Sequence, residues 1–266
     1  MITCSLHNHS TLCDGKSTPK EMIKRAVESG ITDFGFSSHA FASFDLHASI
    51  EKEKKYIDEM RSVIASDDSG INLYLGIEND LYATVADLSV YDYWIGSVHY
   101  FEKDGKYYPV DYSAKRSKEC IAELFGGDER KFYEEYYKNV LTVARQKPDI
   151  LGHFDLITKF GNEVADFTSK QYIETATDYL DECIKKDVIF EINYGAIARG
   201  YTKNPYPSDF LLARLSEKKA KVIVTTDCHD ASKISLGLTD GEQLLKEFGF
   251  TEITLLRNGK WTEEKI

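Results

Sequence analysis

Cysteine is scarce in this sequence, and its spacing offers neither a disulfide framework nor a thiolate metal site. Five cysteines, an odd number, are spread over 266 residues, and no two of them form a C-x-x-C pair. Disulfide-rich secreted domains and zinc modules built on thiolates usually carry cysteines in even numbers or close pairs. The sequence therefore predicts reduced thiols and a cytoplasmic protein.

Long apolar runs and an excess of positive charge are also missing. No stretch approaches the roughly 18 consecutive apolar residues of a membrane-spanning helix, and MITCSLHNHS lacks the basic and then apolar order of an export signal. Lys and Arg number 33 against 44 Asp and Glu, which gives a formal net charge of -11. This balance opposes broad binding to nucleic acid phosphates or anionic lipid. We expect a soluble protein without nucleic acid or membrane partners, in which a small anionic substrate would need locally placed cations.

Linkers rich in proline, glycine or serine and repeats of fixed period are absent too, so we expect one domain over residues 1–266. What recurs is a short apolar run followed by a longer segment of helical period. The runs are 2–7, 33–38, 72–78, 93–99, 149–153, 188–193 and 221–227, and the helical segments are 18–30, 48–66, 129–146, 168–186, 208–219 and 240–248. This alternation predicts an α/β fold in which about seven parallel strands, covered by helices, close or nearly close into a barrel.

Local signals support two of these elements. Thr18, Pro19 and Glu21 form the capping box and proline start of a helix that ends at Gly30. The Asn258-Gly259 pair predicts a tight turn in a C-terminal hairpin.

The histidines follow the same pattern as the strands. Six of the seven lie at or just beyond the carboxyl end of an apolar run: His7, His9, His39, His99, His153 and His229. Only His47 does not, and we expect it at the surface. Glu78 and Asp227 end two of the runs, and Asp14 follows the first. Because the carboxyl ends of parallel barrel strands meet on one face, these side chains should converge there. Taken singly, a histidine such as His39 or His99 is as well explained by a structural hydrogen bond.

Two closely spaced pairs favour a metal centre over that alternative. His7 and His9, and likewise Asp227 and His229, are two residues apart, so on an extended segment both members point to the same side. Cys228, between the second pair, should face the core. Several polar groups converging without a partner would cost several kcal/mol of desolvation. Imidazole and carboxylate ligands without thiolate suit Zn, Mn or Fe, and about nine candidates exceed the needs of one ion, so two or three are expected.

These motifs, in this order, resemble a known family. They are H-x-H at 7–9, CDG at 13–15, a histidine at 39, GIE ending at Glu78, GSVH ending at His99, GHFDL with His153, and D-C-H at 227–229. Their spacing resembles the polymerase-and-histidinol-phosphatase (PHP) superfamily, and GSVHYF, GHFDLITKFG and EINYGAIARGYTKNPYPS are similar to its histidinol phosphatase branch. The resemblance implies a distorted (β/α)7, TIM-like barrel with a trinuclear metal site at the carboxyl ends of the strands.

The resemblance also implies which residues hold which ion. One ion would take His7, His9, Glu78 and Asp227, a second Glu78, His99 and His153, and a third Asp14, His39 and His229, so that Glu78 bridges two of them. The chain departs from the family in two places. It has Asp227-Cys228-His229 where relatives usually read D-A-H, and the basic residue after GHFDL is Lys159, preceded by Thr158.

Such a site suits hydrolysis of a phosphate monoester, because neighbouring metals make hydroxide from a bridging water and neutralise the phosphoryl oxygens. Arg199 is the first candidate for phosphate binding, since its planar fork matches phosphate, although a surface arginine paired with a carboxylate would look the same. Lys159 is the second. Glu78, Asp227 and His229 are the expected catalytic residues, and either Asp227 or His229 would protonate the leaving alkoxide. Phe41, Phe44, Asp45 and Tyr194 could meet an imidazole or ammonium group, or could be loop packing.

The branch implies hydrolysis of L-histidinol phosphate to L-histidinol and phosphate, a step of histidine biosynthesis. Three alternatives stay open from the sequence. The first is a phosphoesterase of the same family that acts on another phosphomonoester, such as a nucleotide or phosphotyrosine. The second is a barrel hydrolase that cleaves C–N bonds, and the third is a non-catalytic metal-binding module.

Overall fold

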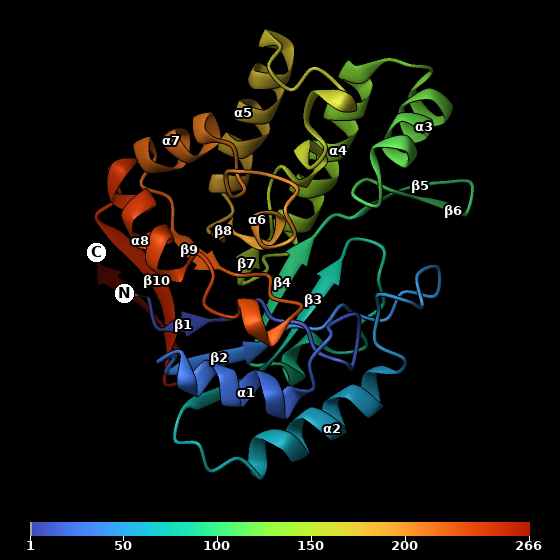
Figure 1. The fold of residues 1–266 in the computed structure, drawn as a ribbon. Coiled ribbons are helices and arrows are strands. Elements are labelled where there is room, and N and C mark those ends of the chain that lie inside the picture. Colours follow the sequence, from blue (N-terminus) through green and yellow to red (C-terminus); the bar gives the residue numbers. More distant parts are fainter. Residues whose placement is uncertain (1) are drawn as a thin grey trace.

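The predicted apolar runs form seven parallel strands that curve into a barrel (Figure 1). The structure, a computed structural model, describes residues 2–266. The sheet order is β1 (Cys4–Ser5), β2 (Asp33–Phe36), β3 (Asn72–Asp80), β4 (Tyr93–Ser97), β7 (Ile150–Leu151), β8 (Ile189–Asn193) and β9 (Val222–Thr225). The expected α/β barrel is confirmed, and several of the predicted ligands lie just beyond the strand ends.

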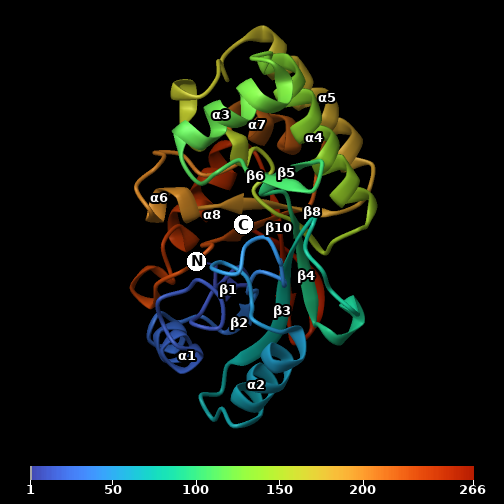
Figure 2. The same cartoon turned by 90° about the vertical axis from the view of Figure 1, so that its right-hand side faces the viewer.

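Helices cover the outside of the barrel. They are α1 (Pro19–Glu28), α2 (Glu53–Ala65), α3 (Ala114–Phe125), α4 (Glu129–Arg145), α5 (Lys170–Ile184), α6 (Gly195–Ala198), α7 (Asp209–Glu217) and α8 (Leu238–Glu247). In both views, α1 and α2 lie on one side of the strands, and α3, α4, α5 and α7 lie on the other (Figure 2). The predicted capping box at Thr18 is present. Within residues 2–266, no helix is both long and apolar enough to cross a membrane.

The barrel closes between its first and last strands through loop backbone and not through a full ladder. Beyond the strand ends, the His9 amide donates to the Cys228 carbonyl at 2.8 Å, and the Cys228 amide donates to the His7 carbonyl at 3.1 Å. At the opposite end, the hairpin β10 (Glu252–Arg257) and β11 (Lys260–Lys265) packs beside β1, where the Cys4 thiol donates to the Leu256 carbonyl at 3.6 Å. The predicted Asn258-Gly259 turn is confirmed, with positive φ at both residues.

Large and small side chains alternate through the barrel interior. Tyr93 is buried, and its hydroxyl donates to the carbonyl of Leu6. A Cβ at Gly35 or Gly76 would lie 2.3 Å from the Tyr93 side chain, so only glycine leaves room for the ring. Tyrosine and glycine therefore fill one layer together, as interior layers of barrels require.

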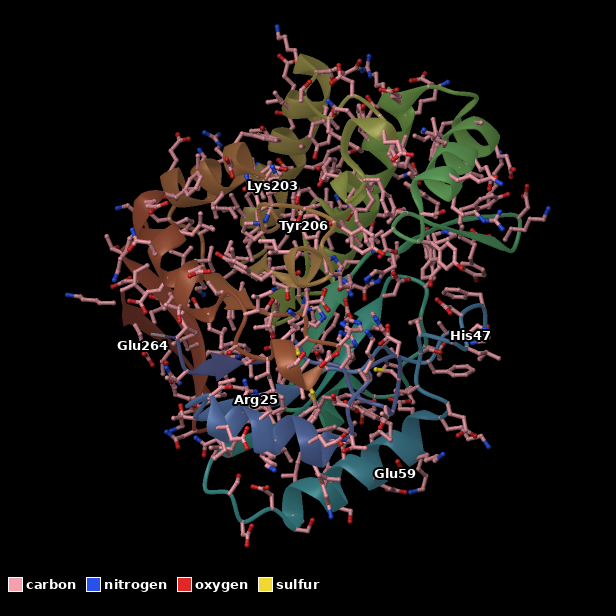
Figure 3. The ribbon with its side chains drawn as sticks, in the orientation of Figure 1. Arg25, His47, Glu59, Lys203, Tyr206 and Glu264 are labelled. Atoms are coloured by element: carbon pink, nitrogen blue, oxygen red, sulfur yellow. The ribbon has the colours of Figure 1, made fainter. Side chains whose placement is uncertain are left out.

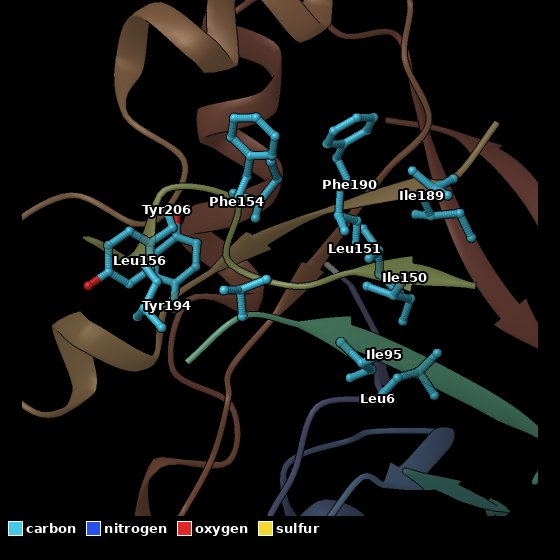
Figure 4. Packing of buried hydrophobic residues seen from close by; sticks show 14 of the residues in the cluster. Leu6, Ile95, Ile150, Leu151, Phe154, Leu156, Ile189, Phe190, Tyr194 and Tyr206 are labelled. Atoms are coloured by element: carbon cyan, nitrogen blue, oxygen red, sulfur yellow. The ribbon is translucent and has the colours of Figure 1, made fainter. Parts of the chain in front are cut away.

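The outer faces of the strands pack against the helices. Phe154 and Phe190 project to the same side of neighbouring chain segments (Figure 4), with ring centroids 6.1 Å apart. The Phe154 ring also stacks on Tyr137 of α4 at 5.1 Å. Burying these large apolar side chains fixes the helices on the sheet and holds the loops between them in place.

One part of the fold was not predicted. Between β4 and β7 the chain forms a hairpin, β5 (Tyr100–Lys103) and β6 (Lys106–Pro109), followed by α3. An Asp104-Gly105 turn signal was present, but both strands carry exposed charged residues and lack a clean alternation of apolar residues. This excursion matters because it builds one wall of the cavity described below.

At the amino-terminal end of the barrel, a buried carboxylate connects the strands to the terminal hairpin. Asp33 is 2% exposed and accepts hydrogen bonds from Arg257 Nη1 at 2.8 Å, Tyr74 Oη at 2.8 Å and Asn72 Nδ2 at 2.8 Å. Burial alone would raise the pKa of Asp33, but Arg257 and these donors hold it below its usual value.

Asp33→Asn should therefore lower the free energy of unfolding by about 2 kcal/mol at pH 7, because a charged hydrogen-bond acceptor is lost. The folded pKa is depressed, so this contribution is present above the unfolded pKa of about 3.9 and disappears as pH falls through the folded pKa. Urea titrations from pH 7 down to pH 3 should show the difference between the wild type and the variant shrinking below about pH 5. A difference that grows with acidity would contradict this account.

Candidate metal centre

The structure brings all nine predicted ligands to the carboxyl end of the barrel. They are His7, His9 and Asp14 after β1, His39 after β2, Glu78 within β3, His99 after β4, His153 after β7, and Asp227 and His229 after β9. The backbone contacts that close the barrel hold the pairs His7/His9 and Asp227/His229 side by side.

Glu78 lies at the middle of this group. Its Oε2 faces His39 Nδ1 at 2.9 Å, His7 Nε2 at 3.1 Å and His9 Nε2 at 3.5 Å. Its Oε1 faces His153 Nε2 at 3.1 Å and His99 Nε2 at 3.5 Å. The two oxygens thus point to different groups of imidazoles, which is the arrangement that a bridging carboxylate needs.

Two further carboxylates complete the group. Asp227 Oδ1 lies 3.3 Å from His9 Nε2 and 3.6 Å from His7 Nε2, on the Oε2 side of Glu78. Asp14 Oδ2 lies 3.2 Å from His229 Nε2 and 3.7 Å from His39 Nε2. Asp14, His39 and His229 thus lie together, as the family resemblance implies. His9 and His39 also face Glu78, so neighbouring sets are in contact with one another.

Several of the facing atoms are buried without a hydrogen bond. Among the described residues these include His7 Nε2, His9 Nε2 and Glu78 Oε2. An unsatisfied buried polar group is unfavourable by about 1–3 kcal/mol, and more when it is charged. Ligand atoms that lie within 4.8 Å of one another form three groups: His7, His9 and Glu78; His39, Glu78 and His99; and His9, Asp14, His39 and His229. The imidazole and carboxylate ligands, and the buried atoms among them that lack hydrogen bonds, therefore fit divalent cations.

The electrostatics of the group are consistent with this fit. Burial would raise the pKa of Glu78, but His39, His7 and His99 hold it well below its usual value. Burial would lower the pKa of His7, but Glu191, Glu78 and Asp227 hold it well above. In contrast, burial and the neighbouring His229 and His39 lower the pKa of His9 to about 3. Glu78 is thus ionised, as a metal-binding carboxylate must be, whereas His7 would have to lose a proton to bind an ion.

Glu191 of β8 is a site residue that the sequence analysis missed. It is fully buried beneath the group, and its Oε1 accepts from His7 Nδ1 and from Thr225 Oγ1 at 2.7 Å. Its Oε2 accepts from the His153 amide at 2.7 Å and Asn193 Nδ2 at 3.0 Å. One carboxylate thus orients His7 and the backbone of His153. The available signal was a glutamate inside the otherwise apolar run VIFEIN.

Asp80 plays a similar part for His99. Its Oδ2 accepts the His99 amide at 2.6 Å and lies 3.4 Å from His99 Nδ1, which leaves Nε2 facing Glu78. Its other oxygen accepts the Tyr82 amide at 2.9 Å. The sequence offered only an acidic residue two positions after Glu78.

Seven of the nine residues, all but the buried His7 and His9, line a cavity of about 270 Å³. Arg199, just beyond α6, lines it and places Nη2 3.1 Å from Asp227 Oδ2 and Nη1 3.4 Å from His229 Nδ1. Burial acts to lower the pKa of Arg199, but Asp227 and Asp111 raise it, so the guanidinium stays charged. Lys159 also lines the cavity, but its ammonium is held by Asp111, with Nζ 2.9 Å from Oδ2 and 2.8 Å from the carbonyl oxygen.

Of the other residues singled out from the sequence, some lie away from the cavity and one lines it. His47 is exposed at the edge of the molecule (Figure 3) and belongs to none of the three groups. Cys228 is buried and donates to the Asp230 carbonyl, as expected for a core residue. Phe44 packs on Tyr100 and Tyr107, whereas Tyr194 is buried outside the cavity lining. Asp45 lines the cavity.

The chain is similar in sequence to known proteins. A family model described as "PHP domain" matches residues 5–195. A Schizosaccharomyces pombe protein named "Probable histidinol-phosphatase" is 25% identical over 279 residues, 96% of this chain and 90% of that one. The histidinol-phosphatase of Bacillus subtilis is 24% identical over 257 residues, 86% of this chain and 94% of that one.

A solved structure is also similar in fold. It is the histidinol phosphate phosphatase of Lactococcus lactis complexed with zinc, L-histidinol and phosphate. The TM-score is 0.72 at 20% sequence identity, and the alignment covers 98% of each chain.

Glu191→Gln should weaken zinc binding about 10–100-fold, because the carboxylate that orients a metal-binding histidine is lost. The amide group of glutamine would also face two of the four donors that Glu191 accepts. Competition with a chromophoric chelator measures this affinity without any turnover. Glu174→Gln, at an exposed position near Lys170, is the matched control and should bind zinc as the wild type does. An unchanged affinity in Glu191→Gln would show that His7 needs no such partner.

Proposed function

This chain belongs to the PHP domain family, and from that premise we propose that it is a metal-dependent phosphatase that hydrolyses L-histidinol phosphate to L-histidinol and phosphate. The observation that carries the proposal is the set of buried imidazole and carboxylate atoms without hydrogen-bond partners, which lies next to a cavity lined by the charged Arg199. Two relatives that align with most of the chain are named histidinol-phosphatases, which supports the choice of substrate.

The centre would hold two or three divalent ions. His7, His9, Glu78 and Asp227 would hold one ion, Glu78, His99 and His153 a second, and Asp14, His39 and His229 a third. Zinc is the first candidate, because the similar Lactococcus lactis enzyme contains it, and imidazole with carboxylate would equally accept manganese or iron. When bound, such ions acidify a water molecule and neutralise phosphoryl oxygens.

Arg199 would bind the phosphoryl group. Its planar guanidinium presents donors at the cavity side of the ligand group, and a phosphate oxygen pair matches that fork. Lys159 would contribute less, because Asp111 already accepts two hydrogen bonds from its ammonium group. Its positive charge still lies on the wall of the cavity and favours an anionic substrate there.

Asp227 is the better candidate for proton transfer to the leaving alkoxide. His229 Nδ1 lies 3.0 Å from the Asp227 carbonyl, which leaves Nε2 for the ligand set with Asp14. Asp227 instead turns Oδ1 to the imidazoles and Oδ2 to Arg199. Burial opposes ionisation of Asp227, but Arg199 and His7 hold its pKa well below the usual value. Oδ2 would accept a proton from the attacking water and return it to the alkoxide oxygen, and the positive charges beside Asp227 make it a weaker base.

The first test compares phosphate release from L-histidinol phosphate, a nucleoside monophosphate, phosphotyrosine and phenyl phosphate by zinc-loaded protein. We expect kcat/KM for L-histidinol phosphate to exceed the others by two or more orders of magnitude, and His9→Ala to be inactive through loss of a ligand. Comparable values for all four esters would remove the histidinol assignment. Turnover of amides without phosphate release would instead favour a C–N hydrolase.

Arg199→Met should lower kcat/KM for L-histidinol phosphate about 10–100-fold, since charged hydrogen bonds contribute about 1.5–3 kcal/mol each and 1.4 kcal/mol is a factor of ten. Zinc content, measured by atomic absorption, should stay at the wild-type level because Arg199 is not among the proposed ligands. Arg199→Lys should recover only part of the rate, since it keeps the charge without the fork. Full activity in Arg199→Met would place phosphate binding elsewhere.

A further inference from the structure

The cavity extends well beyond the metal ligands. Besides the ligand group and Arg199, its wall includes two segments outside the barrel strands, residues 40–49 after β2 and the β5–β6 hairpin. These segments contribute small residues, one acid and one phenol to the lining: Ala40, Ala42, Asp45, Ala48, Ser49 and Tyr100. A substrate whose phosphate lies at Arg199 would extend its organic part toward this wall.

Six carboxylates line the cavity, and five of them have a basic partner. Asp14 and Glu78 face imidazoles, Asp80 faces His99, Asp111 holds Lys159, and Asp227 holds Arg199. Among residues 2–266 the structure gives Asp45 no lysine, arginine or histidine within 4 Å. Its contacts are the Tyr100 hydroxyl, which donates to Oδ2, and the Ala48 amide, which donates to Oδ1 at 3.3 Å.

Asp45 is also held in a fixed position. Phe44 stacks on Tyr107 with ring centroids 3.8 Å apart and packs edge-on against Tyr100 at 4.9 Å. The backbone of this segment is tied to the barrel by the Ile50 amide, which donates to the His39 carbonyl at 3.0 Å. Burial and Asp45 raise the pKa of Tyr100, so its phenol remains a donor. The carboxylate is therefore oriented before any ligand arrives, which favours binding.

We propose that Asp45, oriented by Tyr100, forms a subsite for the cationic group of the substrate, an ammonium or a protonated imidazole on the leaving alcohol. This inference rests on the proposed phosphatase function, which it deepens. A carboxylate without a basic protein partner in a partly buried cavity is best compensated by a positive ligand group. The cavity lining then carries a cation, Arg199, which would bind the phosphate, and an anion, Asp45, from a different segment, which matches a substrate that is anionic at one end and cationic at the other.

Asp45→Asn keeps the shape of the subsite and removes its charge. We expect kcat/KM for L-histidinol phosphate to fall about 10–100-fold, the loss typical of one charged hydrogen bond. Phenyl phosphate, whose leaving group carries no charge, should be hydrolysed within about 2-fold of the wild-type rate. Glu51→Gln, an exposed acid that pairs with Lys55 near the same segment, is the matched control and should change neither substrate.

Binding of L-histidinol, measured by calorimetry on zinc-loaded protein, gives a readout without turnover. Its affinity should fall about 10-fold or more in Asp45→Asn, while the inhibition constant of inorganic phosphate stays unchanged. Equal losses for both esters would mean that Asp45 supports the fold or the metal centre, and no loss for either would mean that the cation binds elsewhere. Both results overturn the subsite.

Failure of the proposed function can be told apart from failure of the subsite. The wild type could hydrolyse other esters but not L-histidinol phosphate. In that case the comparison uses phosphoethanolamine, whose leaving group is cationic, and ethyl phosphate, whose leaving group is uncharged. A preference for the cationic ester that Asp45→Asn abolishes would then uphold the subsite without histidinol. Absence of such a preference, together with unchanged L-histidinol binding in Asp45→Asn, would overturn it.

Discussion

The burial of one carboxylate among five imidazoles governs the architecture of this protein. Glu78 is 1% exposed, and its oxygens lie within 3.5 Å of His7, His9, His39, His99 and His153. Such a group is unfavourable unless charge and hydrogen bonds are balanced. The imidazoles that balance the charge of Glu78 follow different strands of the barrel, so the fold and the site constrain each other. Two further carboxylates orient two of these imidazoles: Glu191 contacts His7, and Asp80 contacts His99.

Much of the fold could be predicted because the signals were local. Buried parallel strands read as short apolar runs, and capping residues such as Thr18 mark helix starts. The convergence of the nine ligand candidates was predictable for the same reason, since a strand end is visible in the sequence and barrel geometry decides where strand ends meet. Taken singly, His39 could equally be a structural residue. The metal-binding interpretation came from the shared location of all the candidates at strand ends.

The parts that escaped prediction depend on contacts between distant segments. Glu191 lies inside an apolar run, and nothing local indicates that its partners are His7 and Thr225, 184 and 34 residues away. The β5–β6 hairpin is stabilised by packing of Tyr107 on Phe44, again between separate segments. The pairing of Lys159 with Asp111 is equally non-local, and it changes how the sequence motif that contains Lys159 is understood. Asp45 was one of four candidates for contact with an imidazole or ammonium group, and only the structure showed that the other five cavity carboxylates have basic partners.

The closure of the barrel links the candidate centre to the order of synthesis. His9 and His7 exchange backbone hydrogen bonds with Cys228, so residues from the two ends of the chain stand together at the site. A growing chain carries His7 and His9 early, but it lacks Asp227 and His229 until more than 200 further residues have been made. The complete ligand set therefore arises only when the last barrel strand is in place. An ion held by the complete set would bind only chains that had finished folding, and its binding energy would favour the closed barrel over open, partly assembled forms.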